Sequence, residues 1–247
     1  MSPENEGDRA LPTKGGSKEI LSMLPEKHRV SIIIPTLNEA SAIESVLRNT
    51  PSKFIDEIIV VDSSDDDTPK IAETFGVKVI REVRRGYGRA LQTGIENAGG
   101  DIIVFIDGDC TYDSRDIPRI IEPILNGECD VVLGDRLNGK SHPGAMHPIN
   151  RLGNIIISLI FSIVFQKRIN DTQCGLRAVR KQLLEGLSYR EYGMPYATEQ
   201  LAKLIKRKAR IRSVPITYRP RVGETKLRRW IDGPRILKTI LMERLSR

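Results

Sequence analysis

Short runs of consecutive apolar residues, most of them β-branched, recur through the first half of the chain. A strand with one wet face alternates apolar and polar residues, whereas an unbroken apolar run is typical of a strand covered on both faces, as in a parallel sheet. The runs therefore predict buried strands. They are VSIIIP (30–35), DEIIVVD (56–62), VKVI (77–80), IIVFID (102–107) and DVVLG (130–134).

Helical patterns lie between these runs. Residues 39–49, 68–75 and 89–98 have the start signals and composition of helices, and Gly99 and Gly100 after the last one indicate a C-terminal cap. Strands and helices that alternate in this way build a doubly wound unit. We therefore predict an α/β, Rossmann-like fold with a mostly parallel sheet flanked by helices.

After residue 134 the pattern changes to longer apolar stretches. Residues 152–165 (LGNIIISLIFSIVF) are fewer than the roughly twenty that a bilayer span needs, so we expect no crossing. Two interpretations stay open: a buried core helix, or an interfacial helix flanked by Arg151, Lys167 and Arg168. The tail, 233–247, has Ile, Leu and Met at helical spacing and either packs on its own domain or meets a membrane surface.

The chain divides into three predicted regions. Residues 1–28 are polar and rich in Gly and Pro, which predicts a flexible leader, and they lack the apolar core of a signal peptide. Residues 29–226 form one domain. Residues 227–247 form a basic, amphipathic C-terminal helix that belongs to this domain or packs on it. With 247 residues and 39% apolar content, the chain can bury a full-sized core.

Charge is unevenly distributed, although the net value is only +7. Residues 201–247 are strongly basic, while 56–116 are dense in Asp. A basic region of this kind suits anionic lipid, phosphorylated substrates or nucleic acid, or serves only as a solubilising surface. Single-strand binders interleave aromatic residues with their cations, and the tail does not, so a nucleic-acid-binding module is the remote alternative and we expect no nucleic acid partner.

Cysteine and histidine usage excludes two kinds of site. The three cysteines are odd in number and widely spaced, which argues against a disulfide framework and fits a reducing, cytoplasmic setting. The three histidines are too scattered for a ligand set. These residues are Cys110, Cys129, Cys174, His28, His142 and His147.

Polar residues follow three of the predicted strands directly. They occupy 35–39, 62–67 and 107–109. In open α/β sheets, ligands bind beyond the carboxyl ends of the strands, so these segments should meet at one acidic, ligand-binding rim.

Two carboxylates on this rim suit a metal ion. Asp107 and Asp109, with Gly108 between them, can turn toward Mg²⁺ or Mn²⁺, which binds one or two carboxylates and completes its shell with water and phosphate oxygens. An ordinary Asp-Gly-Asp turn in water explains the same residues. Asp62 can accept hydrogen bonds from a base or ribose, while the neighbouring Asp cluster caps the helix that starts near Thr68.

A glycine-rich segment adds a second hint of phosphate binding. RRGYGR (84–89) resembles a loop that cradles phosphate at the start of a helix. It lacks the Gly-Lys-Ser/Thr of a Walker loop, so kinase and NTPase functions are disfavoured.

Taken in order, these motifs resemble the family 2 glycosyltransferases of the GT-A fold, and among them the dolichyl-phosphate hexose (mannose or glucose) synthases. The matching segments cover nearly everything after the leader. They are IIIPTLNEA from Ile32, IIVVDSSDDDT from Ile58, RRGYGRALQTG from Arg84, IIVFIDGDCTY from Ile102, VVLGDR from Val131, NRLGN from Asn150, DTQCGLRAVR from Asp171 and VPITYRPRVGETKL from Val214.

The resemblance implies a set of site residues. The nucleotide sugar would contact Pro35, Thr36, Asn38, Glu39, Asp62, Ser64, Gly86, Asp107, Gly108 and Asp109. Asp107 and Asp109 would hold Mg²⁺ or Mn²⁺. The acceptor phosphate would be held by Arg136, Arg151, Arg219, Arg221 and Lys226, the last three on a mobile loop, 219–226. The catalytic residues would be Asp109, Arg136, Arg151 and Arg219.

The resemblance also implies an activity. It is inverting transfer of a hexose from GDP-mannose or UDP-glucose to dolichyl (polyprenyl) phosphate, by an enzyme peripheral to the cytoplasmic face of the membrane. The same fold acting on a soluble phosphorylated acceptor, such as phosphoglycerate, is the alternative. Many of these synthases have Gln where this chain has Thr111, which puts a third metal contact in doubt. Glu199 is either a base or acceptor-side group, or an ordinary residue near a helix start.

Overall fold

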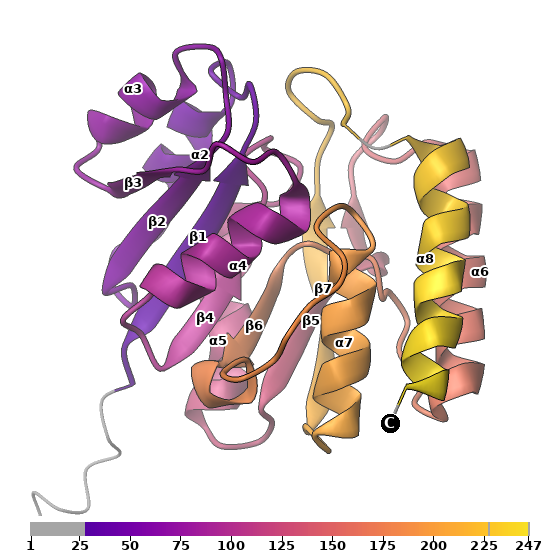
Figure 1. Cartoon of the computed structure of the whole chain (residues 1–247). Coiled ribbons are helices and arrows are strands. Elements are labelled where there is room, and N and C mark those ends of the chain that lie inside the picture. Colours follow the sequence, from indigo (N-terminus) through magenta and orange to yellow (C-terminus); the bar gives the residue numbers. More distant parts are fainter. Residues whose placement is uncertain (1–27, 227, 247) are drawn as a thin grey trace, which may run out of the picture.

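The computed structural model describes residues 28–226 and 228–246, and within them one seven-stranded sheet organises the chain (Figure 1). Its strand order is β3-β2-β1-β4-β6-β5-β7. The strands are β1 (Val30–Thr36), β2 (Glu57–Asp62), β3 (Lys78–Arg81), β4 (Ile102–Phe105), β5 (Val131–Ser141), β6 (Arg177–Arg180) and β7 (Ile211–Tyr218). β6 is antiparallel to both of its neighbours, and the other adjacent pairs are parallel. The predicted mostly parallel sheet is confirmed.

Helices cover both faces of the sheet. The longer ones are α2 (Ile43–Asn49), α3 (Thr68–Glu73), α4 (Tyr87–Asn97), α5 (Ile117–Leu125), α6 (Pro148–Phe165), α7 (Tyr196–Lys206) and α8 (Arg229–Leu245), and two short 3₁₀ turns are η1 (Ser114–Asp116) and η2 (Lys181–Leu183). Apolar residues of α2, α3 and α5 pack in the core on one face, and those of α4, α6, α7 and α8 pack in the core on the other.

The central strand β1 shows why its sequence is apolar at every position. Ile32 and Ile34 face the first core, while Ile33 faces the second, and all three are fully buried. Successive side chains of a strand point to opposite faces, so a strand between two helix layers needs apolar residues on both.

The sequence did not predict every element. β6 and β7 were missed, as was α5, and β5 is longer than its predicted run. β6 has the sequence RAVR, whose arginines hide a buried strand: Arg177 is buried and donates to the carbonyl oxygens of Cys174 and Ala197. Its charged group is thereby satisfied inside the fold.

The cap predicted at Gly99 and Gly100 takes a different form. α4 ends at Asn97, the next residue, Ala98, is in extended backbone, and neither glycine has a positive φ, so the left-handed cap is not formed. Gly100 is needed for a close approach instead, because its N–H donates to Ser31 Oγ at 2.8 Å and an added Cβ would collide with that oxygen.

α6 departs most from its prediction. It begins at Pro148 and has 18 residues with a mean hydropathy of 1.6, so, by length and composition alone, it is the one helix in the described part of the chain that could cross a membrane. Only 11% of it is buried, with Ser158 and Phe161 facing the core, so it is not the buried core helix of the first interpretation. α8 lies beside it and also contacts α7 (Figure 1).

The predicted leader, 1–28, lies outside the described residues except for residue 28. α8 covers most of the predicted C-terminal helix, 227–247, and packs on the same body as the sheet. No disulfide joins the three cysteines, all of which are described.

Candidate active site

A cavity of about 690 Å³ opens where β1 and β4 end. Two kinds of residue line it. Its charged end contains Glu39, Asp107, Asp109, Arg136, Arg221 and Lys226, and its apolar end contains Met146, Ile149, Leu152, Ile156, Ile157, Met194, Trp230 and Ile236. The chain therefore places an acidic and cationic site next to an apolar compartment within one space.

Asp107 follows β4 and is half-buried at the charged end. The hydroxyl of Tyr87 donates to its Oδ1 at 3.1 Å. Burial, and then the nearby charge of Asp109, raise the pKa of Asp107 to about 7. Gly175 leaves room for this carboxylate, because a Cβ at that position would lie 2.8 Å from Asp107 Oδ2.

Asp109 is buried and its two oxygens have different partners. Oδ1 accepts from the backbone N–H of Thr111 at 2.9 Å and from its hydroxyl at 2.6 Å. Oδ2 forms an ion pair with Arg221. Thr111 therefore fixes the orientation of the Asp109 carboxylate.

Arg221 also pairs with Glu39, so its guanidinium bridges two acids. The backbone N–H of Val222 donates to the carbonyl oxygen of Asp109 at 3.0 Å, which fastens the loop over the rim. Burial is the main cause that raises the pKa of Glu39 to about 7, although Arg221 opposes it. Glu39 Oε2 and Arg221 Nε are buried without hydrogen-bond partners.

This arrangement fits a divalent cation. In the described residues no group of three or more His, Cys, Asp or Glu side chains converges, so the candidate carboxylate ligands are the pair Asp107 and Asp109. A Mg²⁺ or Mn²⁺ ion that bridges to a diphosphate needs no more than one or two carboxylates. The guanidinium of Arg221, itself a cation, lies beside Asp109, and an unpaired oxygen of Glu39 is close by. We call the place that this guanidinium occupies the cation position.

The residues expected to bind the nucleotide divide into two groups. Those that line the cavity are Pro35, Thr36, Glu39, Gly86, Asp107, Gly108 and Asp109. Asn38, Asp62 and Ser64 lie outside the lining and build the rim from behind. Asp62 is fully buried and accepts from Thr36 Oγ1 at 2.8 Å and from Ser64 Oγ at 2.6 Å, while Arg81 pairs with its other oxygen. Its predicted contact with a base stays a prediction.

Asn38 adopts the left-handed conformation, with φ of 54°. Its backbone N–H donates to Ser64 Oγ at 2.7 Å, and its side-chain oxygen accepts from the N–H of Asp65 at 2.8 Å. Asn tolerates this conformation better than most residues, so it joins the loops after β1 and β2 at a sharp turn.

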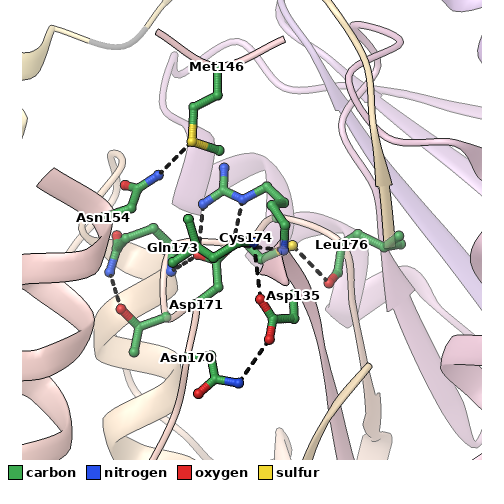
Figure 2. Close-up of polar contacts among 12 residues, drawn as sticks. Asp135, Met146, Asn154, Asn170, Asp171, Gln173, Cys174 and Leu176 are labelled. Atoms are coloured by element: carbon green, nitrogen blue, oxygen red, sulfur yellow. Dashed lines mark hydrogen bonds and ion pairs between the residues drawn. The ribbon is translucent and has the colours of Figure 1, made fainter. Parts of the chain in front are cut away.

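Arg136 is the best anchored of the predicted phosphate-binding residues. It is buried and donates to Asp171 through Nε at 2.7 Å and Nη2 at 2.8 Å, and the aromatic ring of Tyr218 lies 5.3 Å from its guanidinium carbon. The charge of Asp171 holds the pKa of Arg136 above its ordinary value against the cost of burial. Figure 2 shows Asp171 within this network, next to Asp135, which accepts from Asn170 at 2.9 Å.

The other predicted cations are split between two places. Arg221 and Lys226 line the main cavity with Arg136. Arg151 is exposed and donates to the carbonyl oxygen of Leu137 at 2.9 Å, and Arg219 pairs with Asp113 beside a separate cavity of about 160 Å³. The structure therefore does not bring Arg151 or Arg219 into the main cavity, and their catalytic roles stay predictions.

Comparison with known proteins identifies the family. The model of glycosyl transferase family 2 matches residues 31–187 of the chain, well over half of it. The chain belongs to glycosyl transferase family 2. The resemblance inferred from the motifs is confirmed.

Several relatives of this glycosyltransferase come from archaea. It is 34% identical over 215 residues to a dolichyl-phosphate hexose transferase of Haloferax volcanii. The match covers 86% of this chain and 92% of the relative. It is 32% identical to a low-salt glycan biosynthesis hexosyltransferase of the same organism, but spans only 53% of that protein's length. A dolichyl-phosphate N-acetylglucosaminyltransferase of Methanococcus voltae is 32% identical over 211 residues, which cover 76% of this chain and 84% of the relative.

A solved structure supports the GT-A fold. The glucosyl-3-phosphoglycerate synthase of Mycobacterium tuberculosis, crystallised with Mn²⁺, UDP and glucosyl-3-phosphoglycerate, superposes with a TM-score of 0.72. The match covers 95% of this chain and 86% of that one at 24% identity. At this identity the likeness concerns the fold.

Several cavity residues of this glycosyltransferase were not predicted. Tyr87 was visible in the glycine-rich segment, but nothing indicated its contact with Asp107. Gln173 lies in the segment DTQCGLRAVR, which matched the family, but it was not singled out, and Met194 carries no local signal. Trp230, the single tryptophan, could have been singled out as a large apolar residue in a basic segment.

Glu199 lies outside the cavity lining. It is buried in α7 and accepts from the backbone N–H groups of Arg190 and Glu191 at 2.8 to 3.1 Å, with Lys203 3.2 Å away. The segment that it holds includes Tyr192, whose carbonyl oxygen accepts from the N–H of Gly88 at 2.9 Å. Glu199 thus supports the start of α4, in agreement with its interpretation as a helix residue.

Proposed function

We propose that this family 2 glycosyltransferase moves a hexose, with inversion, from a nucleoside diphosphate sugar to a polyprenyl phosphate of the dolichyl type. The observation that carries the proposal is the cavity, which joins a two-carboxylate, cationic end to an apolar end. An amphiphilic acceptor with an anionic head and a hydrocarbon tail has both of these properties. The names of the archaeal relatives support the same substrate class.

The donor would bind at the charged end. Asp107 and Asp109 would hold Mg²⁺ or Mn²⁺, which supplies Lewis-acid stabilisation of the negative charge that develops on the departing diphosphate. Thr111 keeps Asp109 in place, and Tyr87 and Gly175 set the position of Asp107. Arg221, already paired with Asp109 and Glu39, would have to leave the cation position when the donor arrives.

The acceptor would need no general base. A phosphate monoester is ionised at neutral pH, so its oxygen can attack directly once its charge is shielded. Arg136 is held by Asp171 on one side and faces the cavity, and Lys226 lines the same space, so both are available to position a phosphate. Among the described residues, the acids that line the cavity are Glu39, Asp107 and Asp109.

Transfer from labelled GDP-mannose and UDP-glucose, each with Mn²⁺ or Mg²⁺, tests the proposal and distinguishes the two donors and two metals. Label that moves into the chloroform phase with polyprenyl phosphate supports it. Label that moves only onto 3-phosphoglycerate in the aqueous phase would instead establish the soluble-acceptor alternative. The peripheral, cytoplasmic-face location follows from the lipid acceptor and is part of the same proposal.

A further inference from the structure

The apolar end of the cavity opens between the first turns of α6 and α8. Leu152 and Ile156 of α6 line it, and so does Trp230 of α8. These residues are also exposed to solvent, Leu152 by 57% and Trp230 by 81%. The apolar compartment is therefore continuous with the outer surface of the two helices.

This outer surface is unusually apolar. Of the large apolar side chains that are exposed in the described residues, six lie on α6 and five on α8, and only four lie elsewhere. Single exposed apolar residues are ordinary on soluble proteins, but a cluster on two adjacent helices marks an interaction surface. The α6–α8 face, as we name it, comprises Ile149, Leu152, Ile155, Ile156, Leu159, Ile163, Trp230, Ile231, Leu241, Met242 and Leu245.

The charges around the α6–α8 face are mainly positive. Exposed cations accompany both helices: Arg151, Lys167, Arg168, Arg228, Arg235, Lys238 and Arg244. Two acids lie on α8: Glu243 is buried and neutralised by Lys203 and Lys206, and Asp232, in the first turn, is half-buried and accepts from the backbone N–H of Arg228, so the exposed cations outnumber the acids. Apolar side chains bordered by Arg and Lys suit a helix that lies in the plane of an anionic leaflet, and cations in that position add attraction to the headgroups.

The second half of α6 is fastened to the fold. Phe161 is fully buried in the core, and Ser158 Oγ accepts from the N–H of Thr172 at 3.0 Å. A crossing orientation would separate these contacts, whereas an orientation in the headgroup plane keeps them. The helix is therefore suited to lie on a bilayer and not to span it.

We propose that the α6–α8 face docks into the headgroup region of an anionic leaflet, and that the acceptor's isoprenoid chain enters the cavity between the first turns of the two helices. The chain would pass Leu152, Ile156 and Trp230, and its phosphate would reach Arg136 and Lys226. This inference rests on the proposed function and adds how the enzyme takes its substrate from a membrane.

Vesicle sedimentation tests docking without any assay of turnover. The wild type should sediment with vesicles of phosphatidylcholine and phosphatidylglycerol, less with phosphatidylcholine alone, and less as NaCl is raised. The double variant Leu159→Glu/Ile163→Glu should bind roughly a hundredfold more weakly, because it puts two charges into the apolar layer. Neither residue lines the cavity. Val83→Glu, at an 82% exposed apolar residue elsewhere, is the matched control and should bind as the wild type.

Chain entry is tested by comparing a long polyprenyl phosphate with a short, water-soluble prenyl phosphate. Leu152→Glu and Trp230→Ala should lower the ratio of kcat/KM for the long acceptor to that for the short one by about tenfold or more. Thermal stabilisation by the nucleoside diphosphate with Mn²⁺ should persist, which shows that the variants fold. The Leu159→Glu/Ile163→Glu variant should keep wild-type transfer to the short acceptor.

The outcomes separate this inference from the proposed function. If the wild type glycosylates no prenyl phosphate but binds anionic vesicles through this face, the proposed function and chain entry fail while docking stands. If it glycosylates the lipid and the glutamate variant binds vesicles unchanged, docking is overturned. Light scattering that shows a dimer, converted to a monomer by the same variant, would assign the face to a second copy of the chain and also overturn docking.

Discussion

The rim at the ends of β1, β2 and β4 and the α6–α8 face differ in how completely the protein satisfies them. On the rim, Asp62 is fully buried and each of its oxygens has protein partners. On the α6–α8 face, apolar side chains such as Leu159 and Leu245 are 58% and 84% exposed to water. Buried polar groups of the first region mostly have protein partners, with Glu39 Oε2 as an exception, whereas the second region leaves large apolar side chains exposed to water.

The difference shows that the exposed apolar surface and the polar binding groups belong to separate elements, the first to helices α6 and α8 and the second to the strand ends. Strands that are buried on both faces hold the rim rigidly, which suits a site that must fix carboxylates. Helices that pack along one side only leave the other side open to a large and fluid partner. The cavity connects the two, so a molecule that is anionic at one end and apolar at the other can contact both.

The largest expected effect comes from removing one acid of the rim. Asp109→Ala should reduce kcat/KM by about a thousandfold or more, because electrostatic stabilisation of the departing diphosphate is lost. The variant should keep its fold, since other buried groups maintain the sheet, but lose the thermal stabilisation that Mn²⁺ gives with nucleotide. Transfer assays and thermal unfolding measure the two effects. Turnover within tenfold of the wild type would contradict the role assigned to Asp109.

A pair of substitutions on α6 sharpens the comparison within one helix. Phe161→Ala should lower the free energy of unfolding by about 3 kcal/mol, because the ring is fully buried, whereas Leu159→Ala, at a residue 58% exposed, should change it by less than about 0.5 kcal/mol. Urea denaturation measures both. Equal losses would show that the outer side of α6 is covered in solution.

The ionised acids of the rim should lower the free energy of unfolding. The pKa of Asp107 is raised to about 7, so the part of the stability that depends on its neutral form is present below about pH 4 and lost as the pH rises through 7. At pH 8 the free energy of unfolding of Asp107→Asn should therefore exceed that of the wild type by about 2 kcal/mol, after allowance for the half-buried position of the residue. At pH 4 the two free energies should be nearly equal. A pH series of thermal unfolding without metal measures the gap. A gap that does not change with pH would contradict this cause.

The smallest expected effect concerns Arg221. Arg221→Ala removes the guanidinium between Asp109 and Glu39, so Mn²⁺ alone should bind about fivefold more tightly, although transfer should be slower because the loop is less well fixed. Metal titration by calorimetry in the absence of nucleotide measures the first effect. Weaker Mn²⁺ binding would mean that Arg221 does not compete for the cation position.

The sequence predicted the rim better than the α6–α8 face, because buried strands leave a clearer local pattern than a helix that is exposed on one side. Buried parallel strands such as β1 and β4 have unbroken apolar runs, and the strand-end rule then brings Asp107 and Asp109 to one edge without knowledge of any contact. β6 could not be found in this way, because its burial depends on bonds from Arg177 to carbonyl oxygens that a local pattern does not reveal. Arg221 reaches Glu39 from 182 residues away, a contact set by the path of a loop.

The sequence predicted the α6–α8 face only in part. The apolar run 152–165 was recognised, but its helix begins earlier, at Pro148. The first turn was not included in the prediction because Asn150 and Arg151 are polar and interrupt the apolar run. Composition could not decide between core and surface, because both environments accept the same residues. Only the packing of Phe161 inward and Leu159 outward distinguishes them.

A Cβ added at Gly175 would lie only 2.8 Å from Asp107 Oδ2, which is closer than two such atoms can approach. An alanine at that position would push against the carboxylate and alter its acidity and direction, leaving the acid itself chemically intact. The reactivity of the site is therefore governed in part by a residue that bears no functional group, and efforts to retune the enzyme can begin there.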